Sequence, residues 1–277
     1  MTGGCMTVDD FVTALGLPSS CRVDQRVPKK LLIETGAPTA ADKRLINDRI
    51  EKIQWLAALK PNTIGVPAYS DDVREYLEIA VLYITLRGEP MTAANLARLA
   101  ELVHRAVPYP VLLLLNTPQE LSLSLAHKRW AQNEAGKVVL DGDVMITALD
   151  VNASEAPVAV SADPTATAQP ILPAFLQAIA LRHQPQANLM DVYLGWMACL
   201  LALQVARFTG TFKHEIGIKP LFNKREQLQI LERLAADATS LRSQAAKARQ
   251  LAQQVELNLA LLRVQAQLTQ ARSQLSN

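Results

Sequence analysis

The C-terminal segment constrains the fold of this chain more than any other part of its sequence. From residue 221 to residue 277 it contains neither Gly nor Pro. Apolar residues recur there in alternating steps of three and four, from Leu231 to Ala266, which is the spacing of a coiled-coil seam. The pattern predicts one continuous helix over 221–277, about 80 Å long.

A single helix cannot bury this stripe by itself, so the seam needs a partner. We expect a homo-oligomer formed through the C-terminal coiled coil, or pairing with another chain. The alternative is a helix that folds back on its own globular domain. The larger seam residues, which should contribute most of the pairing energy, are Leu231, Leu234, Leu241, Val255, Leu259 and Leu262.

The first 150 residues alternate between helical and extended patterns, which favours a mixed α/β sheet. Residues 79–84 are entirely apolar, so their strand should be central and covered on both faces. Asp141-Gly142 is typical of a hairpin turn between the strands on either side of it. We predict helices over 7–17, 40–61, 91–106, 168–183 and 189–208, and strands over 22–34, 63–66, 76–86, 111–115, 121–125 (half-exposed), 138–140 and 144–149.

These elements predict an α+β protein with four parts. Residues 1–151 form the mixed α/β domain, and 152–170, rich in Ala, Ser, Thr and Pro, form a linker or long loop. Residues 171–220 form a helical segment that packs on the α/β domain, and 221–277 form the coiled-coil helix.

Composition excludes several classes of protein. The formal net charge is only +2, so the chain is neither strongly basic nor strongly acidic. Its three cysteines are far apart and form no metal-ligand pair or disulfide framework, which fits a reducing cytosol. No signal peptide is visible, and the longest apolar stretch, 192–206, is short for a bilayer span. We expect a soluble cytoplasmic protein without a membrane partner.

Motifs for nucleotide, dinucleotide and common hydrolase chemistry are missing from the sequence. The four histidines share no metal-ligand spacing, and we predict neither a metal nor a cofactor. The best catalytic candidates are Glu75 and Glu78, which begin a long strand and could bind Mg²⁺ in a divergent nuclease. The lysine that such a site needs is missing from the residues that follow Glu78.

Clustered basic residues suggest a different function. Phosphate groups of nucleic acid pair with such clusters in a salt-sensitive, sequence-independent way. The C-terminal segment also carries eight Lys and Arg against four Asp and Glu. The alternative is a solvated polar face. The candidates for nucleic-acid binding are Arg22, Arg26, Lys29, Lys30, Lys128 and Arg129.

Five segments resemble an uncharacterised bacterial family that is named only as a domain of unknown function. They are ALGLP at 14–18, VDQRVPKKLLIE at 23–34, EYLEIAVLYITL at 75–86, VPYPVLLLL at 107–115 and VELNLALLRVQAQL at 255–268. The resemblance implies a genetic context, because genes of this family commonly lie beside helicase and DNA methyltransferase genes in restriction-like antiviral defence clusters. It implies no catalytic residue.

Together these observations favour a non-catalytic accessory subunit of a bacterial defence system. Its α/β domain would bind a partner such as a helicase or a methyltransferase subunit, and its C-terminal helix would self-associate. The alternatives are the divergent Mg²⁺-dependent nuclease and a sequence-nonspecific nucleic-acid-binding module.

Overall fold

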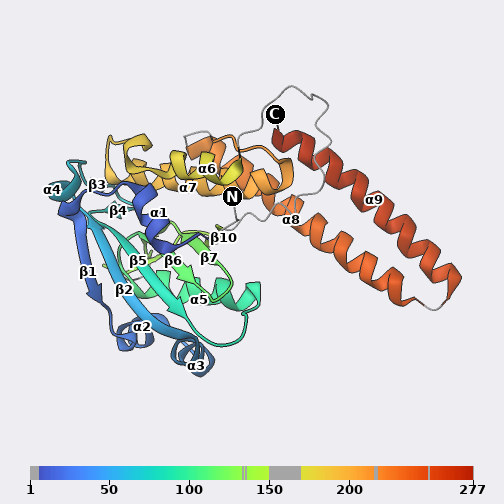
Figure 1. The fold of residues 1–277 in the computed structure, drawn as a ribbon, viewed down its shortest axis with the longest axis horizontal. Helices are drawn as coiled ribbons and strands as arrows, with labels where there is room; N and C mark the ends of the chain where they lie inside the picture. The colour runs from blue at the N-terminus through green and yellow to red at the C-terminus, as the bar shows by residue number, and fades with distance from the viewer. Residues whose placement is uncertain are drawn as a thin grey trace. The chain divides into compact units, whose positions relative to one another are not determined.

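Strand β5 (Ile79–Leu86) lies at the centre of a six-stranded sheet, as its apolar run predicts. The sheet has the order β1-β2-β5-β6-β7-β10, and its strands are antiparallel except for the parallel pair β5 and β6. Figure 1 shows this arrangement. The other strands of the sheet are β1 (Arg22–Arg26), β2 (Ile50–Leu59), β6 (Val111–Asn116), β7 (Leu121–Leu125) and β10 (Met145–Ala148).

This computed structural model describes residues 6–132, 134, 136–149, 170–214, 218–248 and 250–276. The predicted linker over 152–170 lies outside the described residues, except for its last position. The chain divides into two units. Unit 1 comprises residues 1–152 and 172–200, and unit 2 comprises residues 153–171 and 201–277.

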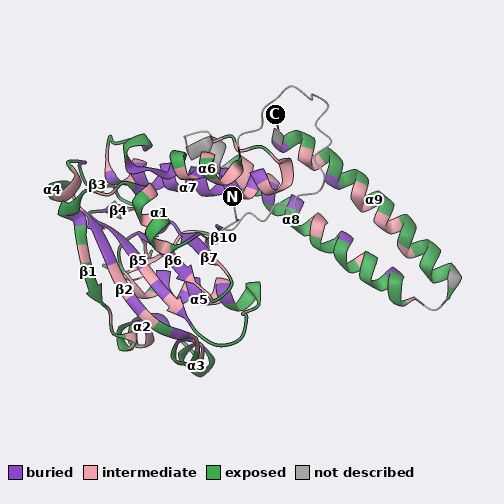
Figure 2. Ribbon diagram, in the orientation of Figure 1, coloured by how far each residue is buried: buried purple, intermediate pink, exposed green. Residues whose placement is uncertain are grey.

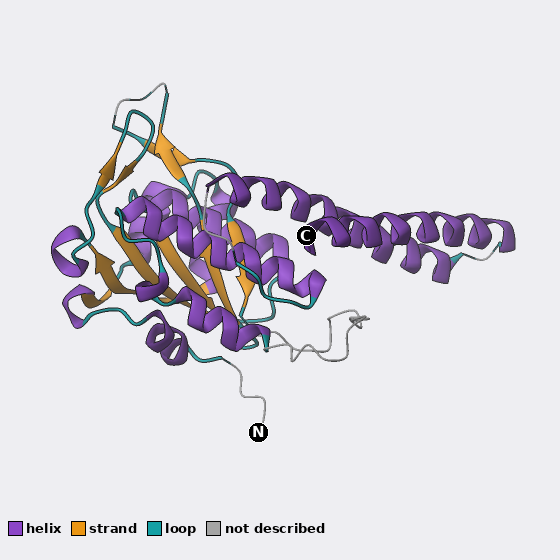
Figure 3. Ribbon diagram, turned by 90° about the horizontal axis from the view of Figure 1, so that it is seen from above, coloured by secondary structure: helices purple, strands orange, loops and turns teal. Residues whose placement is uncertain are grey.

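Helices cover both faces of the sheet in unit 1 (Figures 1 and 3). On one face, α2 (Lys29–Gly36), α3 (Ala40–Arg49) and α5 (Ala93–Ala106) pack on the strands through one apolar core. On the other face lie α1 (Val8–Leu15), α6 (Ile171–Ile179) and the first part of α7 (Leu189–Thr209). The two-sided cover explains why β5 and β6 are apolar at successive positions rather than at alternate ones.

Short elements complete the described part of unit 1. Two small sheets pair β3 (Tyr69–Ser70) with β4 (Glu75–Tyr76) and β8 (Lys128–Trp130) with β9 (Val138–Leu140). The 3-10 helices η1 (Ser19–Cys21) and η2 (Leu181–His183) and the short helix α4 (Pro61–Ile64) connect longer elements.

Two of the predicted helices, α1 and α5, are confirmed, and capping contacts explain where they begin or end. Thr7 forms a capping box with Asp10 at the start of α1, and Gly16 ends that helix in the left-handed conformation with φ of 60°. The Thr92 side chain accepts a hydrogen bond from the Asn95 amide at the start of α5. The predicted fold class, α+β with a mixed sheet, is confirmed.

Two segments of the predicted secondary structure are wrong because tertiary pairing decides between similar local patterns. The predicted strand over 22–34 ends at Arg26, and helix α2 begins directly after Pro28. The predicted helix over 40–61 ends at Arg49, and β2 follows it without a loop. The apolar residues of β2 fit the spacing of a helix as well as that of a strand. The segment is a strand because its backbone hydrogen-bonds to both β1 and β5.

Smaller corrections concern exposure and strand partners. Residues 61–64 form a helical turn, where we predicted a strand over 63–66. All of β7 is buried, including its two serines, so it is not half-exposed as predicted. The strands that flank Asp141-Gly142 exist, but β9 pairs with β8 and β10 pairs with β7, so they form no hairpin with each other.

The C-terminal segment of unit 2 forms two helices, so the prediction of one continuous helix over 221–277 is wrong. Helix α8 (Ile218–Lys247) and helix α9 (Leu251–Ser276) fold back on each other as a hairpin (Figures 1 and 3). The physical reason is a second apolar repeat in α9, which packs against α8 within the same chain. Its buried or half-buried members are Leu257, Leu261, Val264, Leu268, Ala271 and Leu275.

Helix α7 is long and apolar enough to cross a membrane by length and composition alone. In the structure, however, 83% of its most apolar window is buried. Trp196 is among its fully buried side chains, and its indole N–H donates to the Ile179 carbonyl oxygen at 2.9 Å. This burial fits the core helix of a soluble protein.

Close packing of α2 on α5 predicts that Gly36→Ala destabilises the protein. A Cβ atom at Gly36 would lie 2.5 Å from the Leu102 carbonyl oxygen and 2.7 Å from the Ala106 Cβ. Because backbone must move to relieve this overlap, we expect the free energy of unfolding to fall by about 1–3 kcal/mol in urea titrations. The surface substitution Glu34→Ala on the same helix is the control, with a change below about 0.5 kcal/mol. Equal effects of the two substitutions would contradict the close packing.

Candidate functional site

The two candidate catalytic carboxylates lie near the start of β5 but in different surroundings. Glu78 directly precedes β5, and its side chain is only 8% exposed. Its Oε2 atom lies 3.0 Å from the Nζ atom of Lys60, which follows the last residue of β2. Because β2 and β5 are paired so that Leu59 is opposite Ile79, the two charged residues meet at the same sheet end. Lys60 thus supplies the basic neighbour that the sequence after Glu78 lacks.

The other carboxylates near Glu78 in sequence do not join it in a metal site. Glu75 is on β4, opposite Ser70 in a two-stranded sheet. The carboxylate of Asp71 stabilises the intervening turn, accepting hydrogen bonds from the Val73 and Arg74 amides and the Tyr69 hydroxyl. Among the described residues, no group of three or more His, Cys, Asp or Glu side chains could hold a metal. The nuclease alternative therefore stays a prediction from sequence.

Most of the candidate nucleic-acid-binding residues have partners in the protein. Arg22 forms an ion pair with Asp24 at 3.2 Å, and Lys30 forms one with Glu34 at 3.6 Å. Arg129 lies 3.6 Å from Asp141, which also pairs with Arg74. Lys128 is only 3% exposed, so its ammonium group is not available to a phosphate.

Arg26 and Lys29 remain, and the structure brings Arg87 to them from the end of β5. These three residues, here named the basic cluster, form no ion pair with any described carboxylate. Burial, followed by the charges of Arg87 and Arg26, lowers the pKa of Lys29. Arg87 was missed from the sequence because only the sheet register places it beside the N-terminal segment.

Two members of the basic cluster also have a structural role at the C-terminus of α3. Arg87 donates from Nε to the Asp48 carbonyl oxygen and from Nη2 to that of Asn47, both at 3.0 Å. Lys29 Nζ donates to the same Asn47 oxygen at 3.4 Å. Cations are favourable at the negative end of a helix dipole, so these contacts stabilise α3. Arg26 has no such contact with α3 among the described hydrogen bonds.

A set of buried polar side chains lies near the same sheet end as Glu78. The Tyr76 hydroxyl oxygen is 3.1 Å from His127 Nδ1, and the Tyr76 and Tyr193 rings are 5.8 Å apart. The Tyr193 hydroxyl lies 2.8 Å from the Val111 carbonyl oxygen and accepts a hydrogen bond from the Ala126 amide at 3.0 Å. These contacts attach α7 to the ends of β6 and β7. Their role is structural, because these hydrogen bonds join β4, β6, β7 and α7.

Lys128 is the buried cation of unit 1 that has no carboxylate partner among the described residues. Its ammonium group donates hydrogen bonds to the carbonyl oxygens of Val107 and Tyr109, just beyond the C-terminus of α5. Burial lowers the pKa of Lys128 to about 7. His104 on α5, whose Nε2 is 3.0 Å from Ser124 Oγ, has its pKa lowered well below the usual range by burial and then by the charge of Lys128.

The predicted coiled-coil seam is divided between two different faces in unit 2. Its α8 half lies inside the hairpin, where Leu231 is buried and Leu234 and Leu241 are half-buried. Its α9 half is exposed. Val255, Leu259 and Leu262 are 50%, 51% and 62% exposed. Figure 2 draws much of α9 in the colour of exposed residues. These three residues, together with Ala252 and Ala266, are here named the outer stripe.

The geometry of a helix explains the division of the seam. Each residue turns the helix by about 100°, so a shift of two residues leads to nearly the opposite face. The residues of α9 that pack on α8 are displaced by two from the outer stripe, as Leu257 is from Val255 and Leu261 is from Leu259. Helix α9 is therefore apolar on two opposite faces, and the hairpin covers only one of them.

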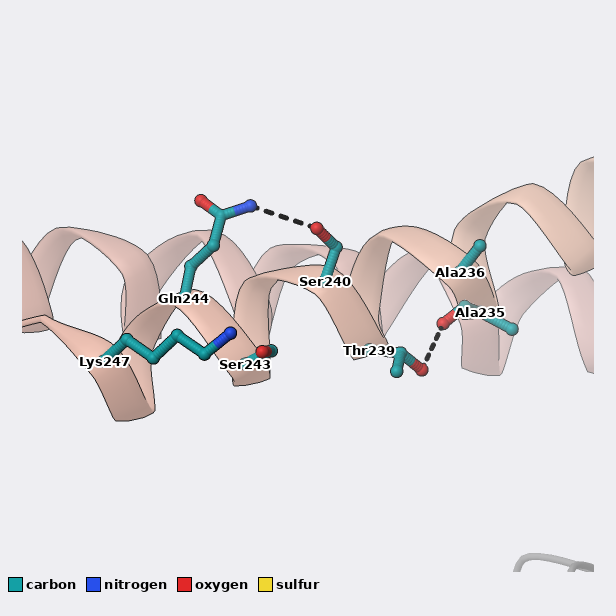
Figure 4. A pocket seen from close by; sticks show the side chains of 7 residues that line it. All are labelled: Ala235, Ala236, Thr239, Ser240, Ser243, Gln244 and Lys247. Atoms are coloured by element: carbon teal, nitrogen blue, oxygen red, sulfur yellow. Dashed lines mark hydrogen bonds between the residues drawn. The ribbon is translucent and has the colours of Figure 1, made fainter.

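A shallow hollow on α8 lies between Ala235 and Lys247, and Figure 4 shows the side chains that line it. The Thr239 hydroxyl donates to the Ala235 carbonyl oxygen at 3.0 Å, and Gln244 Nε2 donates to Ser240 Oγ at 3.0 Å. Most of these side chains are exposed and their hydrogen bonds are local to α8, so the hollow does not enclose a ligand site. Among the described residues, the outer stripe and the basic cluster are two surfaces that offer contacts to another molecule.

The fold defines an α+β protein with a mixed six-stranded sheet and a C-terminal helical hairpin. Residues 15–268 match the family model described as a domain of unknown function (DUF4391), and the chain belongs to this family. Comparison with curated proteins finds no significant match, and comparison with solved structures also finds none.

The burial of Lys128 predicts a dependence of stability on pH. Its pKa of about 7 in the folded protein is below the unfolded value of about 10.4. Between these pH values the unfolded chain binds the additional proton, so the free energy of unfolding should rise with pH across this interval. We expect Lys128→Met to remove this rise.

The measurement is urea denaturation of both proteins at pH 7.5 and pH 9.5, an interval above the titration of His104. Only the difference between wild type and variant is interpreted, because other groups titrate in both proteins. A pH dependence that is the same in Lys128→Met would contradict the assignment to Lys128.

Proposed function

We propose that this protein is a non-catalytic accessory subunit of a bacterial antiviral defence system, located in the cytoplasm, with the C-terminal hairpin as its assembly element. The observation that carries the proposal is the outer stripe of α9. Three large apolar side chains remain exposed in a row on a helix whose other apolar face is already packed. Exposed apolar surface of this kind typically marks a site of protein interaction.

The rest of the described chain supports a binding role more than a catalytic one. Two buried titratable side chains of unit 1, Tyr193 and Lys128, hydrogen-bond to backbone carbonyl oxygens. Glu78, the buried carboxylate at the sheet end, has Lys60 as its partner. Resemblance to a family encoded beside helicases and DNA methyltransferases favours one of these enzymes as the partner.

The proposal predicts capture of such an enzyme through the hairpin. We expect the tagged full-length protein, co-expressed with the helicase or methyltransferase encoded beside it, to retain that enzyme on affinity resin at 150 mM salt. A chain that ends at Lys219 should lose it, while its circular dichroism keeps the β-sheet signal. Equal capture by both chains would show that the hairpin is not the assembly element, and no capture by either would contradict the choice of partner.

Nucleic-acid binding is a second candidate function, favoured by the basic cluster. Arg26 and Lys29 are on adjacent elements, and repulsion among the three cations of the cluster is not balanced by a described ion pair. The charge of Glu51 offsets part of this repulsion at Lys29, and a phosphate group would add further negative charge. Such contacts predict binding that depends on salt and not on sequence.

We expect Arg26→Gln/Lys29→Gln to weaken binding to duplex DNA and to lower the slope of log K against log salt by about 1–2. Fluorescence anisotropy with two unrelated duplexes between 50 and 200 mM salt measures this effect. Arg87 is left intact because it donates two hydrogen bonds of 3.0 Å to the end of α3, whereas Lys29 donates a single one at 3.4 Å. The matched control is Lys30→Gln/Lys137→Gln, which removes the same charge from two lysines that already have carboxylate partners. Binding that is equal in both variants would dismiss the basic cluster as the contact surface.

A further inference from the structure

We infer that the outer stripe of α9 binds the outer stripe of a second copy of this chain, and that the two α9 helices pair antiparallel about a two-fold axis. The inference rests on the proposed function, in which the hairpin is the assembly element. It adds the identity of one partner, the surface and the orientation. The evidence is the spacing of the apolar residues and the position of two charges beside them.

The outer stripe of one copy is complementary in shape to the outer stripe of a second copy that runs in the opposite direction. In an antiparallel pair centred between Leu259 and Leu262, Leu259 lies level with the partner's Leu262, and the converse pair follows by symmetry. One layer further out, Val255 lies level with the partner's Ala266. Leucines therefore meet at the centre, and a larger side chain meets a smaller one on each side, which suits close packing. A two-fold axis of this kind gives a closed dimer.

Two charged residues select this orientation. Glu256 and Arg263 follow Val255 and Leu262 directly, so both flank the outer stripe on the same side. Both are exposed, and neither forms an ion pair with another described residue. They are seven residues apart, about 10.5 Å along the helix, which is too far for them to pair with each other.

In the antiparallel pair, each of these charges meets its opposite. The partner's Arg263 lies about 3 Å along the axis from Glu256, within the reach of both side chains. The two-fold axis repeats this contact, so the dimer contains two ion pairs on the rim of its apolar seam. In a parallel pair the flanking positions opposite Glu256 and Arg263 are Leu251 and Asn258, and neither residue is charged. Charge complementarity therefore favours the antiparallel pair.

The exposed face of α8 does not continue the apolar surface. Its exposed residues are mostly polar or charged, and Ile230 is the large apolar exception in the described part of that helix. The seam between copies thus involves α9 and leaves α8 at the outside of the dimer. The exposed polar residues of α8 include Arg233, Asp237, Ser240, Gln244 and Lys247.

The first experiment measures self-association of the full-length chain by sedimentation and light scattering between 1 and 100 µM. We expect a dimer whose dissociation constant rises at least about 100-fold in Leu259→Gln/Leu262→Gln, because four buried leucines are lost per dimer. Helical circular dichroism should not change, since both side chains are exposed within one copy. The matched control is Ile230→Gln on α8, which makes the same type of change and should leave the dimer intact.

The second experiment tests the orientation by charge reversal. Glu256→Arg alone and Arg263→Glu alone should each raise the dissociation constant about tenfold, because two attractive contacts per dimer become repulsive. When the two single variants are mixed, both contacts of the mixed dimer join opposite charges, so this dimer should form at about the wild-type affinity. Asp237→Arg on α8 changes the net charge as Glu256→Arg does and should have no effect on affinity.

The outcomes separate this inference from the proposed function. A full-length chain that is monomeric up to 100 µM overturns the inference, while capture of the partner enzyme still tests the accessory role. A dimer that tolerates Leu259→Gln/Leu262→Gln overturns the choice of surface, because its contact then lies elsewhere. A dimer that requires the leucines but ignores both charge reversals overturns the antiparallel orientation.

Discussion

The burial of β5 and β6 on both faces is the constraint on which unit 1 depends. Parallel neighbours cannot be joined by a tight turn, so α5 must cross from the end of β5 to the start of β6. This crossing places α5 on one face of the sheet. The opposite face needs cover as well, because side chains such as Val81 and Leu114 have no exposure at all. The chain supplies that cover late in its sequence, with α6 and the first part of α7.

Cover on both faces leaves the polar groups of the sheet end inside the protein. Backbone carbonyls at the ends of β6 and α5 lie where solvent is excluded, and each unsatisfied group there would cost about 1–3 kcal/mol. The Tyr193 hydroxyl and the Lys128 ammonium group lie against these carbonyls. The most strongly shifted pKa values of unit 1 thus arise from the requirements of packing. Function is more reasonably sought on the surface, at the basic cluster and in unit 2.

Sequence patterns predicted elements whose signals are local or strongly apolar, such as α1, α5, β5 and β6. They failed where two periods fit the same residues. Ile46, Ile50 and Ile53 have helical spacing, yet the last two belong to β2, because this segment lies between two partner strands. Contacts between side chains on neighbouring strands also could not be predicted from the sequence. The ion pair of Lys60 with Glu78 depends on the register of β2 against β5, which no single segment encodes.

The C-terminal segment shows the same ambiguity in one helix. Residues 251–276 contain two apolar repeats on opposite faces, and only the outer stripe continues the heptads of α8, because the other repeat is displaced from it by two residues. Sequence patterns favour the repeat that continues along one uninterrupted helix. The folded chain instead changes direction after α8 and packs the other repeat of α9 against α8. This change of direction buries one apolar face of α8 and one of α9 against each other within one copy. It needs only a short connection and no second molecule. The outer stripe is then not needed for the hairpin itself. Apolar side chains that the hairpin does not need, flanked by charges that the hairpin does not pair, are better explained by contact with another molecule than by folding.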